Sequence, residues 1–285
     1  MGRLACAAVL LALPANAKAQ QTTIDKSGYT LLDPVPEDAL RTMATDRPNE
    51  TNTPTTIDAG HLQIEAGVID YAHDNDDGDR QRTWGYGELN FRLGVLDRLD
   101  LNIVIEPHQV IHDNDRSIGS DRGARGFGDI MVGGKLNLWG DDGAGSTWST
   151  AFALQPQIKL PTAALGVGNR RVEYALAAPF QMVLPVGFNL SVQPSLLRLR
   201  NSGNDGYVTG YEGAVAIDHD IGLLDAYAEY VADDTSENGQ PSQQTLDLGG
   251  TLPLGHNLVF DTGVNLGLTK ASPDFKWLTG LSLRL

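Results

Sequence analysis

Residues 88–106 read ELNFRLGVLDRLDLNIVIE, and this stretch decides the fold class. On both sides of a tight connection at residues 94–98, every second residue is apolar: Leu89, Phe91 and Leu93, then Leu99, Leu101, Ile103 and Ile105. Alternation with a period of two is typical of a β-strand that has one apolar and one polar face. The stretch therefore predicts two antiparallel strands joined by a turn.

The same period recurs from Gly60 to the last residue. Stretches of about 10 to 13 residues alternate in this way, and Gly, Asn or Asp residues bound them. The chain ends on Leu281, Leu283 and Leu285, with polar residues between them. We count about twelve such strands, and an even number is typical of outer-membrane barrels.

The connections between these strands alternate in length. The connections at 73–80, 112–126, 161–171, 201–206, 233–242 and 269–276 are polar and mostly long. Those at 94–98, 140–146, 185–187, 219–222 and 255–257 are shorter or tighter. Long loops on one rim and short turns on the other are typical of an outer-membrane barrel.

Aromatic residues gather near the expected strand ends. They are Tyr71, Trp84, Tyr86, Trp139, Trp148, Phe188, Tyr207, Tyr211, Tyr230 and Trp277. Such rings suit the two interfacial girdles of a membrane barrel.

A soluble β-sandwich also alternates and is the competing interpretation. It would need a very large core to receive the apolar faces of about twelve strands, whereas lipid accepts them without limit, and closure removes the edges that lipid forbids. The sequence therefore predicts an all-β fold, a transmembrane antiparallel up-and-down β-barrel of about twelve strands.

The N-terminus resembles an export signal. Arg3 precedes the apolar residues 4–13, and Ala17-Lys18-Ala19 fits a cleavage site. We expect a signal peptide at 1–19, a polar leader at 20–59 and the barrel at 60–285, located in the cell outer membrane. The single cysteine, Cys6, leaves with the signal, so no disulfide is expected.

The composition excludes other classes. With 21 basic and 36 acidic residues the formal net charge is -15, which disfavours binding to nucleic acid. Beyond the first twenty residues no apolar run is long enough to cross a bilayer as a helix.

Several motifs resemble a known family. They are DRPNETNTP at 46–54 followed by GHLQIE at 60–65, GFGDI at 126–130, KLNLWG at 135–140 and IKLPT at 158–162. The chain is similar over residues 46–285 to a proteobacterial outer-membrane transporter family labelled as meta-pathway phenol-degradation proteins. The resemblance implies an outer-membrane barrel that passes small, aromatic or hydrophobic molecules. It departs at Leu285, where many outer-membrane barrels end in Phe, so recognition by the barrel-assembly machinery is expected to be weaker.

Charged residues on the polar face are the candidate pore-lining residues. They are Glu65, Glu88, Arg92, Asp100, Glu106, Asp129, Lys135, Lys159, Glu173, Glu212, Asp225, Glu229, Asp247 and Asp261. Acids exceed bases, which predicts a conduit that favours cations or neutral solutes over anions. The alternative is that these charges pair across the lumen and brace the wall.

Asp46, Arg47 and Pro48 stand just ahead of the first strand and form the candidate plug. The segment either folds back into the lumen or forms a solvated tether.

No enzyme, metal or cofactor is expected. No histidine lies in an H-x-S arrangement and no G-x-S-x-G motif occurs, which disfavours an outer-membrane hydrolase. In the acidic stretch 73–79, a calcium loop would require His73 and Trp84 as ligands, so the stretch fails the EF-hand pattern.

The sequence therefore predicts a passive channel for small solutes. A sealed structural or loop-mediated barrel without transport is the first alternative, and an outer-membrane hydrolase is the second. The expected partners are outer-membrane lipid and lipopolysaccharide, the barrel-assembly machinery and small-molecule solutes.

Overall fold

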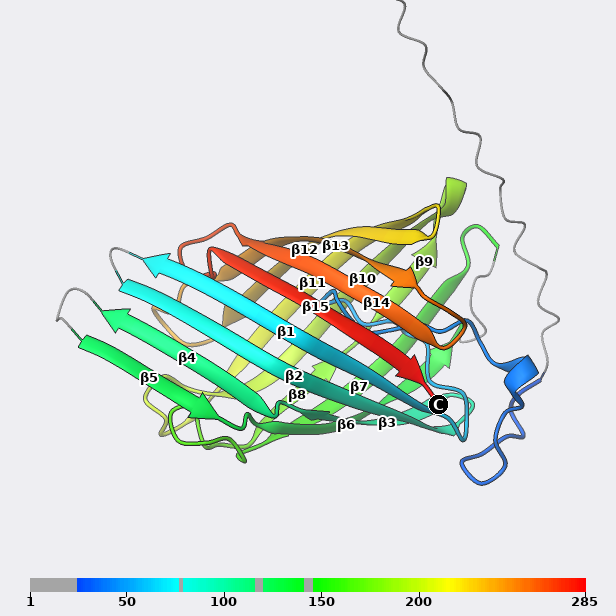
Figure 1. The fold of residues 1–285 in the computed structure, drawn as a ribbon, viewed down its shortest axis with the longest axis horizontal. Helices are drawn as coiled ribbons and strands as arrows, with labels where there is room; N and C mark the ends of the chain where they lie inside the picture. Colours follow the sequence, from blue (N-terminus) through cyan, green and yellow to red (C-terminus); the bar gives the residue numbers. More distant parts are fainter. Residues whose placement is uncertain (1–24, 77–78, 116–119, 141–145) are drawn as a thin grey trace, which may run out of the picture.

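A computed structural model describes residues 25–76, 79–115, 120–140 and 146–285, and they form one closed antiparallel sheet (Figure 1). The strands are β1 (Leu62–Asp76), β2 (Asp79–Leu96), β3 (Leu99–Ile105), β4 (His108–Asp115), β5 (Ser120–Gly126), β6 (Ile130–Trp139), β7 (Thr150–Leu160), β8 (Glu173–Ala177), β9 (Phe180–Val183), β10 (Phe188–Arg200), β11 (Tyr207–Ile221), β12 (Leu224–Thr235), β13 (Gln243–Pro253), β14 (Leu258–Gly267) and β15 (Phe275–Arg284). Two 3-10 helices are η1 (Glu37–Ala39) and η2 (Pro185–Gly187).

The sheet closes because β1 pairs with both β15 and β2. The barrel wall has twelve strand positions, which we call staves. Three of these staves are interrupted and consist of two shorter strands each: β3 with β4, β5 with β6, and β8 with β9. Pro107 and Pro179 lie at two of the interruptions, where the missing N–H ends the ladder. The predicted barrel of about twelve antiparallel strands is confirmed.

The wall is polar inside and apolar outside. In β3, Asp100 and Asn102 are 1% and 3% exposed, whereas Leu101 and Ile103 are 49% and 43% exposed. This arrangement is the reverse of a soluble protein and fits a barrel whose outer face meets lipid. Among the described residues there is no helix long and apolar enough to cross a membrane.

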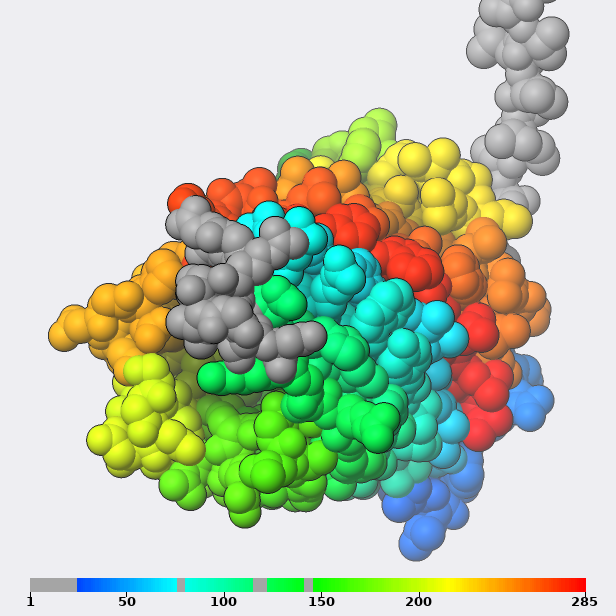
Figure 2. All heavy atoms as spheres, turned by 60° about the vertical axis from the view of Figure 1, so that its left-hand side comes forward, coloured from blue at the N-terminus to red at the C-terminus, as the bar shows by residue number. Residues whose placement is uncertain are grey.

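Two of the predicted long loops are wrong. The stretch 73–80 belongs to β1 and β2, which pair up to Asp76 and Asp79, and the stretch 112–126 belongs largely to β4 and β5. Backbone hydrogen bonds continue these hairpins beyond the apolar part of the wall. The strands can be polar there because water, not lipid, surrounds them. The hairpins extend from one end of the barrel (Figure 1), and Figure 2 turns this end forward.

The short turns are less uniform than expected. The connection predicted at 140–146 runs from the end of β6 at Trp139 to the start of β7 at Thr150, and residues 141–145 lie outside the described residues. It is as long as several connections on the other rim. The alternation of lengths is therefore only approximate.

The leader turns back into the barrel. Residues 25–59 contain η1 and a small apolar cluster of Val35, Ala39 and Ala59, which lies at the rim of the chain termini (Figure 1). Residues 46–58 contact the inner wall. The predicted signal peptide, 1–19, lies outside the described residues.

Candidate functional site

The inward face of the barrel carries charged residues that the alternation of apolar and polar residues predicts to line the pore. Seven of the fourteen candidates are at most 1% exposed: Glu65, Arg92, Asp100, Lys135, Glu229, Asp247 and Asp261. Charges this deeply buried require partners. Most of those partners come from the leader or from neighbouring staves.

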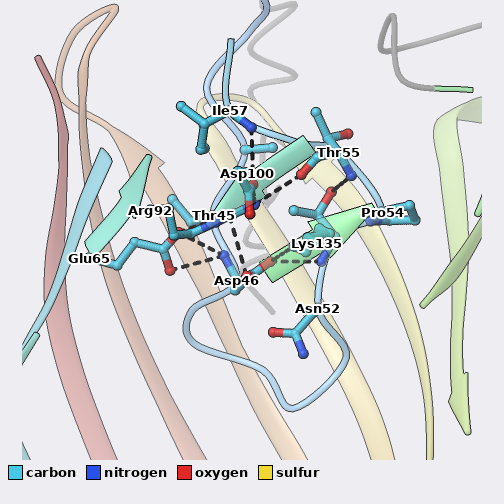
Figure 3. A network of polar contacts seen from close by, with 12 residues as sticks. Thr45, Asp46, Asn52, Pro54, Thr55, Ile57, Glu65, Arg92, Asp100 and Lys135 are labelled. Carbon is cyan, nitrogen blue, oxygen red and sulfur yellow. Dashed lines mark hydrogen bonds and ion pairs between the residues drawn. The ribbon is translucent and has the colours of Figure 1, made fainter. Parts of the chain in front are cut away.

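Asp46 of the leader joins one network of ion pairs (Figure 3). Its carboxylate lies 2.6 Å from Lys135 Nζ on β6 and 3.4 Å from Arg92 Nη1 on β2. Arg92 also contacts Glu65 at 3.1 Å and Asp100 at 2.9 Å. The backbone N–H of Asp46 donates to Glu65 at 3.1 Å, so the network joins the leader to β1, β2, β3 and β6.

The surroundings of Asp46 favour its charged form. Burial alone would raise the pKa of this carboxyl, but the positive charges of Arg92 and Lys135 outweigh the burial and hold the pKa below its ordinary value. The Lys135 ammonium and the backbone N–H of Thr53 also donate hydrogen bonds to it. Asp46 is therefore an anion clamped between two cations of the wall.

Arg47 reaches another part of the lumen. Its guanidinium lies 3.4 Å from Asp261 on β14, 3.5 Å from Glu88 on β2 and 3.7 Å from Asp70 on β1. Burial would lower the pKa of Arg47, but these three carboxylates raise it above its ordinary value. The adjacent Pro48 lines the cavity described below.

The following residues of the leader contact the far wall. The backbone N–H groups of Glu50 and Thr51 each donate to Glu229 on β12 at 2.8 Å, and the Thr51 hydroxyl also donates to it. The Asn52 backbone N–H donates to Gln193 on β10 at 2.9 Å. Because β6, β2, β14, β12 and β10 are distributed around the ring, the leader crosses the lumen.

A second set of contacts holds the leader at the rim of the termini. Asp58 pairs with Arg41 at 2.8 Å and with Lys26 at 3.0 Å, and Arg41 also pairs with Asp97. The leader backbone presses so closely on β2 here that a Cβ on Gly94 would lie 2.1 Å from the Asp58 carbonyl oxygen. Between the leader and the wall at this end lies a small cavity of about 10 Å³, lined by Arg41, Asp58 and Gln63 among others.

A larger cavity of about 540 Å³ lies between the leader and the rim of the long hairpins. Residues 46–50 and Asn52 contribute to its lining from the leader side. Its charged lining is mainly acidic: Asp46, Glu50, Glu65, Asp70, Glu88, Glu106 and Glu212, against Arg47 and Lys276. Apolar side chains also reach it: Val104, Met131, Leu197 and Leu278.

The remaining candidates lie away from the leader. Lys159 is 3.2 Å from Asp129 and 2.7 Å from Glu173, which forms a separate ion-pair cluster on the wall. Asp247 accepts a hydrogen bond from Asn265 at 2.9 Å. Asp225 lies on β12 near the turn to β11 and lines neither cavity.

Several lumen residues are not among the candidates, and Asp70, Gln193 and Lys276 are three of them. Asp70 follows an irregularity in which Val68 and Gly87 are both unpaired, so the inward positions of β1 change parity there. Two successive apolar residues, Val68 and Ile69, are the only sign of this shift in the sequence. Gln193 could have been singled out by alternation alone, but it carries no charge.

No histidine contact resembles a hydrolytic site in the described part of the chain. His61 contacts the carbonyl oxygens of Leu285 and Val35, and His219 contacts that of Gly187. The described ranges also contain no cluster of His, Cys, Asp or Glu arranged to hold a metal ion.

Comparison with known proteins gives one family. The profile of a family described as "Putative MetA-pathway of phenol degradation" matches residues 45–285. No curated protein shows significant similarity to the chain.

The chain is also similar in fold to solved structures. NanC porin is 7% identical, with 79% of this chain and 100% of that chain covered and a TM-score of 0.46. The CymD monoaromatic hydrocarbon channel is 9% identical, with 79% and 87% covered and a TM-score of 0.42. Outer membrane phospholipase A from Escherichia coli is 12% identical, with 77% and 92% covered and a TM-score of 0.41.

Proposed function

The chain belongs to the family described as "Putative MetA-pathway of phenol degradation", and from this membership and the lumen we propose an outer-membrane channel for small solutes that its own leader closes. In this proposal the leader is the plug, with Asp46, Arg47 and Pro48 at its centre. Transport is passive and follows the gradient of the solute.

The observation that carries the proposal is the path of the leader across the lumen. A solvated tether would not require buried charges, yet Asp46 and Arg47 are matched by charges on four staves. Removing one partner of a buried ion pair by substitution costs about 3–5 kcal/mol, because the other charge stays buried without a partner. Its contacts are polar, and water can replace them when the leader leaves.

The volume and lining of the cavity indicate the class of solute. Its volume of about 540 Å³ lies in the range of small-molecule sites. The acidic lining attracts cations and repels anions. Val104, Met131, Leu197 and Leu278 add apolar surface that a single aromatic ring could contact, in agreement with the name of the family.

Export to the outer membrane completes the proposal. The signal peptide at residues 1–19 would direct the chain across the inner membrane, and the barrel-assembly machinery would insert it. The apolar outer face then meets lipid and lipopolysaccharide.

The experiment that tests the solute preference is a reversal-potential measurement in planar bilayers under a salt gradient, with residues 20–58 deleted. We expect a cation preference that Glu106→Gln reduces, because Glu106 lines the cavity. Glu173→Gln is the matched control, since Glu173 pairs with Lys159 outside the cavity. An anion preference, or equal effects of the two variants, would contradict the proposed selectivity.

A sealed structural barrel is the second candidate. The contacts of Arg41 and Asp58 favour it, because they hold the leader at the rim in addition to the contacts of Asp46. A folded, leader-deleted barrel that remains silent in the bilayer would favour this function over the channel.

A further inference from the structure

Three arginines share the outer face of the protruding hairpins. Arg82 on β2 pairs in register with His112 on β4, and Val110 on β4 pairs with both Trp84 and Arg125. Register partners lie on the same face of a sheet, as do residues two apart on one strand. Arg80, Arg82 and Arg125 therefore project from the face that carries Trp84.

The neighbouring aromatic rings fix the height of this face relative to the membrane. Tyr71 and Trp84 have ring centroids 4.3 Å apart, and Trp84 stacks on Tyr86 at 6.2 Å. A belt of Trp and Tyr marks the interface between lipid and water. Along the strand, at about 3.3 Å per residue, Arg82 lies roughly 7 Å beyond Trp84 and Arg80 roughly 13 Å, whereas Arg125 lies in the register row of Trp84, two strands away.

These arginines differ from the buried cations of the lumen. Arg92, Lys135 and Lys159 each pair with carboxylates of the lumen. Arg82 and Arg125 are exposed and Arg80 is half-buried, and within the described residues none of the three has an ion pair or hydrogen bond. In a chain of net charge -15, these three arginines lie on one face without a carboxylate partner among the residues whose side chains the structure describes.

We propose that Arg80, Arg82 and Arg125 bind the phosphate groups of lipopolysaccharide in the outer leaflet. Guanidinium groups pair with phosphate oxygens through two parallel N–H···O bonds, which suits arginine better than lysine. The lipid A phosphates occupy the headgroup layer, directly above an aromatic belt. The site lies on the outer face and is separate from the lumen, so it does not depend on the proposed channel.

The test measures binding of rough lipopolysaccharide to the purified, folded barrel in mild detergent by the shift in thermal unfolding. We expect Arg82→Gln to weaken binding about tenfold, because it removes a charge-assisted hydrogen bond and a loss of about 1.4 kcal/mol is a factor of ten. The triple variant R80Q/R82Q/R125Q should abolish measurable binding. Arg82→Lys should retain part of the affinity, because it keeps the charge and loses the bidentate geometry.

The matched control is Arg98→Gln, which removes the same charge from an exposed arginine at the opposite rim. The Arg98→Gln variant should bind lipopolysaccharide like the unaltered chain. Neither chain should bind dephosphorylated lipid A. Heat-modifiable gel mobility verifies folding, and single variants replace the triple variant if that one does not fold. Unchanged affinity in R82Q and R125Q, or equal binding of dephosphorylated lipid A, would overturn the proposal. Full competition by inorganic phosphate at millimolar concentration would show an anion site without lipid specificity and would also overturn it.

Discussion

At the scale of single residues, the lumen depends on pairs between one leader charge and one wall charge. Lys135 and Lys159 can be compared directly, because both are inward-facing lysines that pair with carboxylates. Only Lys135 is held by the leader. The two residues therefore separate the closing of the lumen from the bracing of the wall.

Lys135→Met should loosen the leader. Asp46 would lose the closer of its two cations while remaining buried, which costs about 3 kcal/mol of docking free energy. We expect faster cleavage after Glu50 by a glutamyl endopeptidase in the folded barrel, measured by mass spectrometry. Lys159→Met should leave the cleavage rate unchanged, and similar rates in both variants would exclude a specific role for the Asp46 contact.

Acid should release the leader through Asp46. Its pKa is held below the ordinary value of 3.8, so its contribution to docking is present above that value and is lost as the pH falls below it. The charges facing it are Arg92, Lys135, Glu65 and Asp100, and Asp46→Asn leaves all four in place. The difference in leader cleavage between the two chains, measured with an acid-active protease, should be large at pH 7 and should shrink below pH 4. A difference that stays constant with pH would contradict this assignment.

At the scale of elements, the leader and the wall approach each other backbone to backbone. Gly94 Cα faces the Asp58 carbonyl so closely that any side chain must displace the leader. Gly213, on β11, has open space where its side chain would lie. The two glycines form a matched pair for substitution.

Gly94→Ala should therefore destabilise the docked leader by about 1–3 kcal/mol, the usual cost of overpacking. Gly213→Ala should cost less than 1 kcal/mol, as surface substitutions do. Thermal unfolding and leader proteolysis together measure both effects. Equal destabilisation by the two variants would show that the close approach at Gly94 has no special role.

A covalent lock tests whether the leader must move. The mature chain is expected to have no cysteine, and Asn52 contacts Gln193 through two hydrogen bonds of 2.9 and 3.1 Å. Cross-linking N52C/Q193C should suppress current through the barrel, and a reducing agent should restore it. Either single-cysteine variant is the control, and current that persists in the cross-linked chain would disprove movement of the leader.

Alternation in the sequence predicted the staves but not their interruptions or their shift. It predicts β2 and β3 well, since lipid and lumen impose opposite demands on neighbouring residues. It fails at Val68 and Gly87, where local backbone geometry changes which residues point inward. The acidic hairpin beyond His73 has the composition of a loop, yet β1 and β2 continue into it by pairing alone.

The lumen was predictable as a set of residues but not as a set of pairs. Residues such as Arg92 and Asp261 follow from alternation. Their partners Asp46 and Arg47 lie 46 and 214 positions away along the chain, and only closure of the sheet brings them together. The contact between Glu229 and Thr51 has no signal in the sequence for the same reason.

At the scale of the whole molecule, the barrel combines an apolar exterior, an acidic cavity and a polar segment laid across the lumen. The exterior and the closed sheet follow from the alternation of residues. In the proposed function the leader closes the channel, and the Asp58–Arg41 pair is one of the contacts that hold it at the end of the lumen near the termini.

The most direct measurement compares the conductance of the folded mature chain with that of the same chain lacking residues 20–58, in planar bilayers. We expect a low or intermittent current for the intact chain and steady, larger, cation-preferring steps for the deleted one. Equal conductance of the two chains, with folding and insertion verified for both, would contradict the claim that the leader closes the channel.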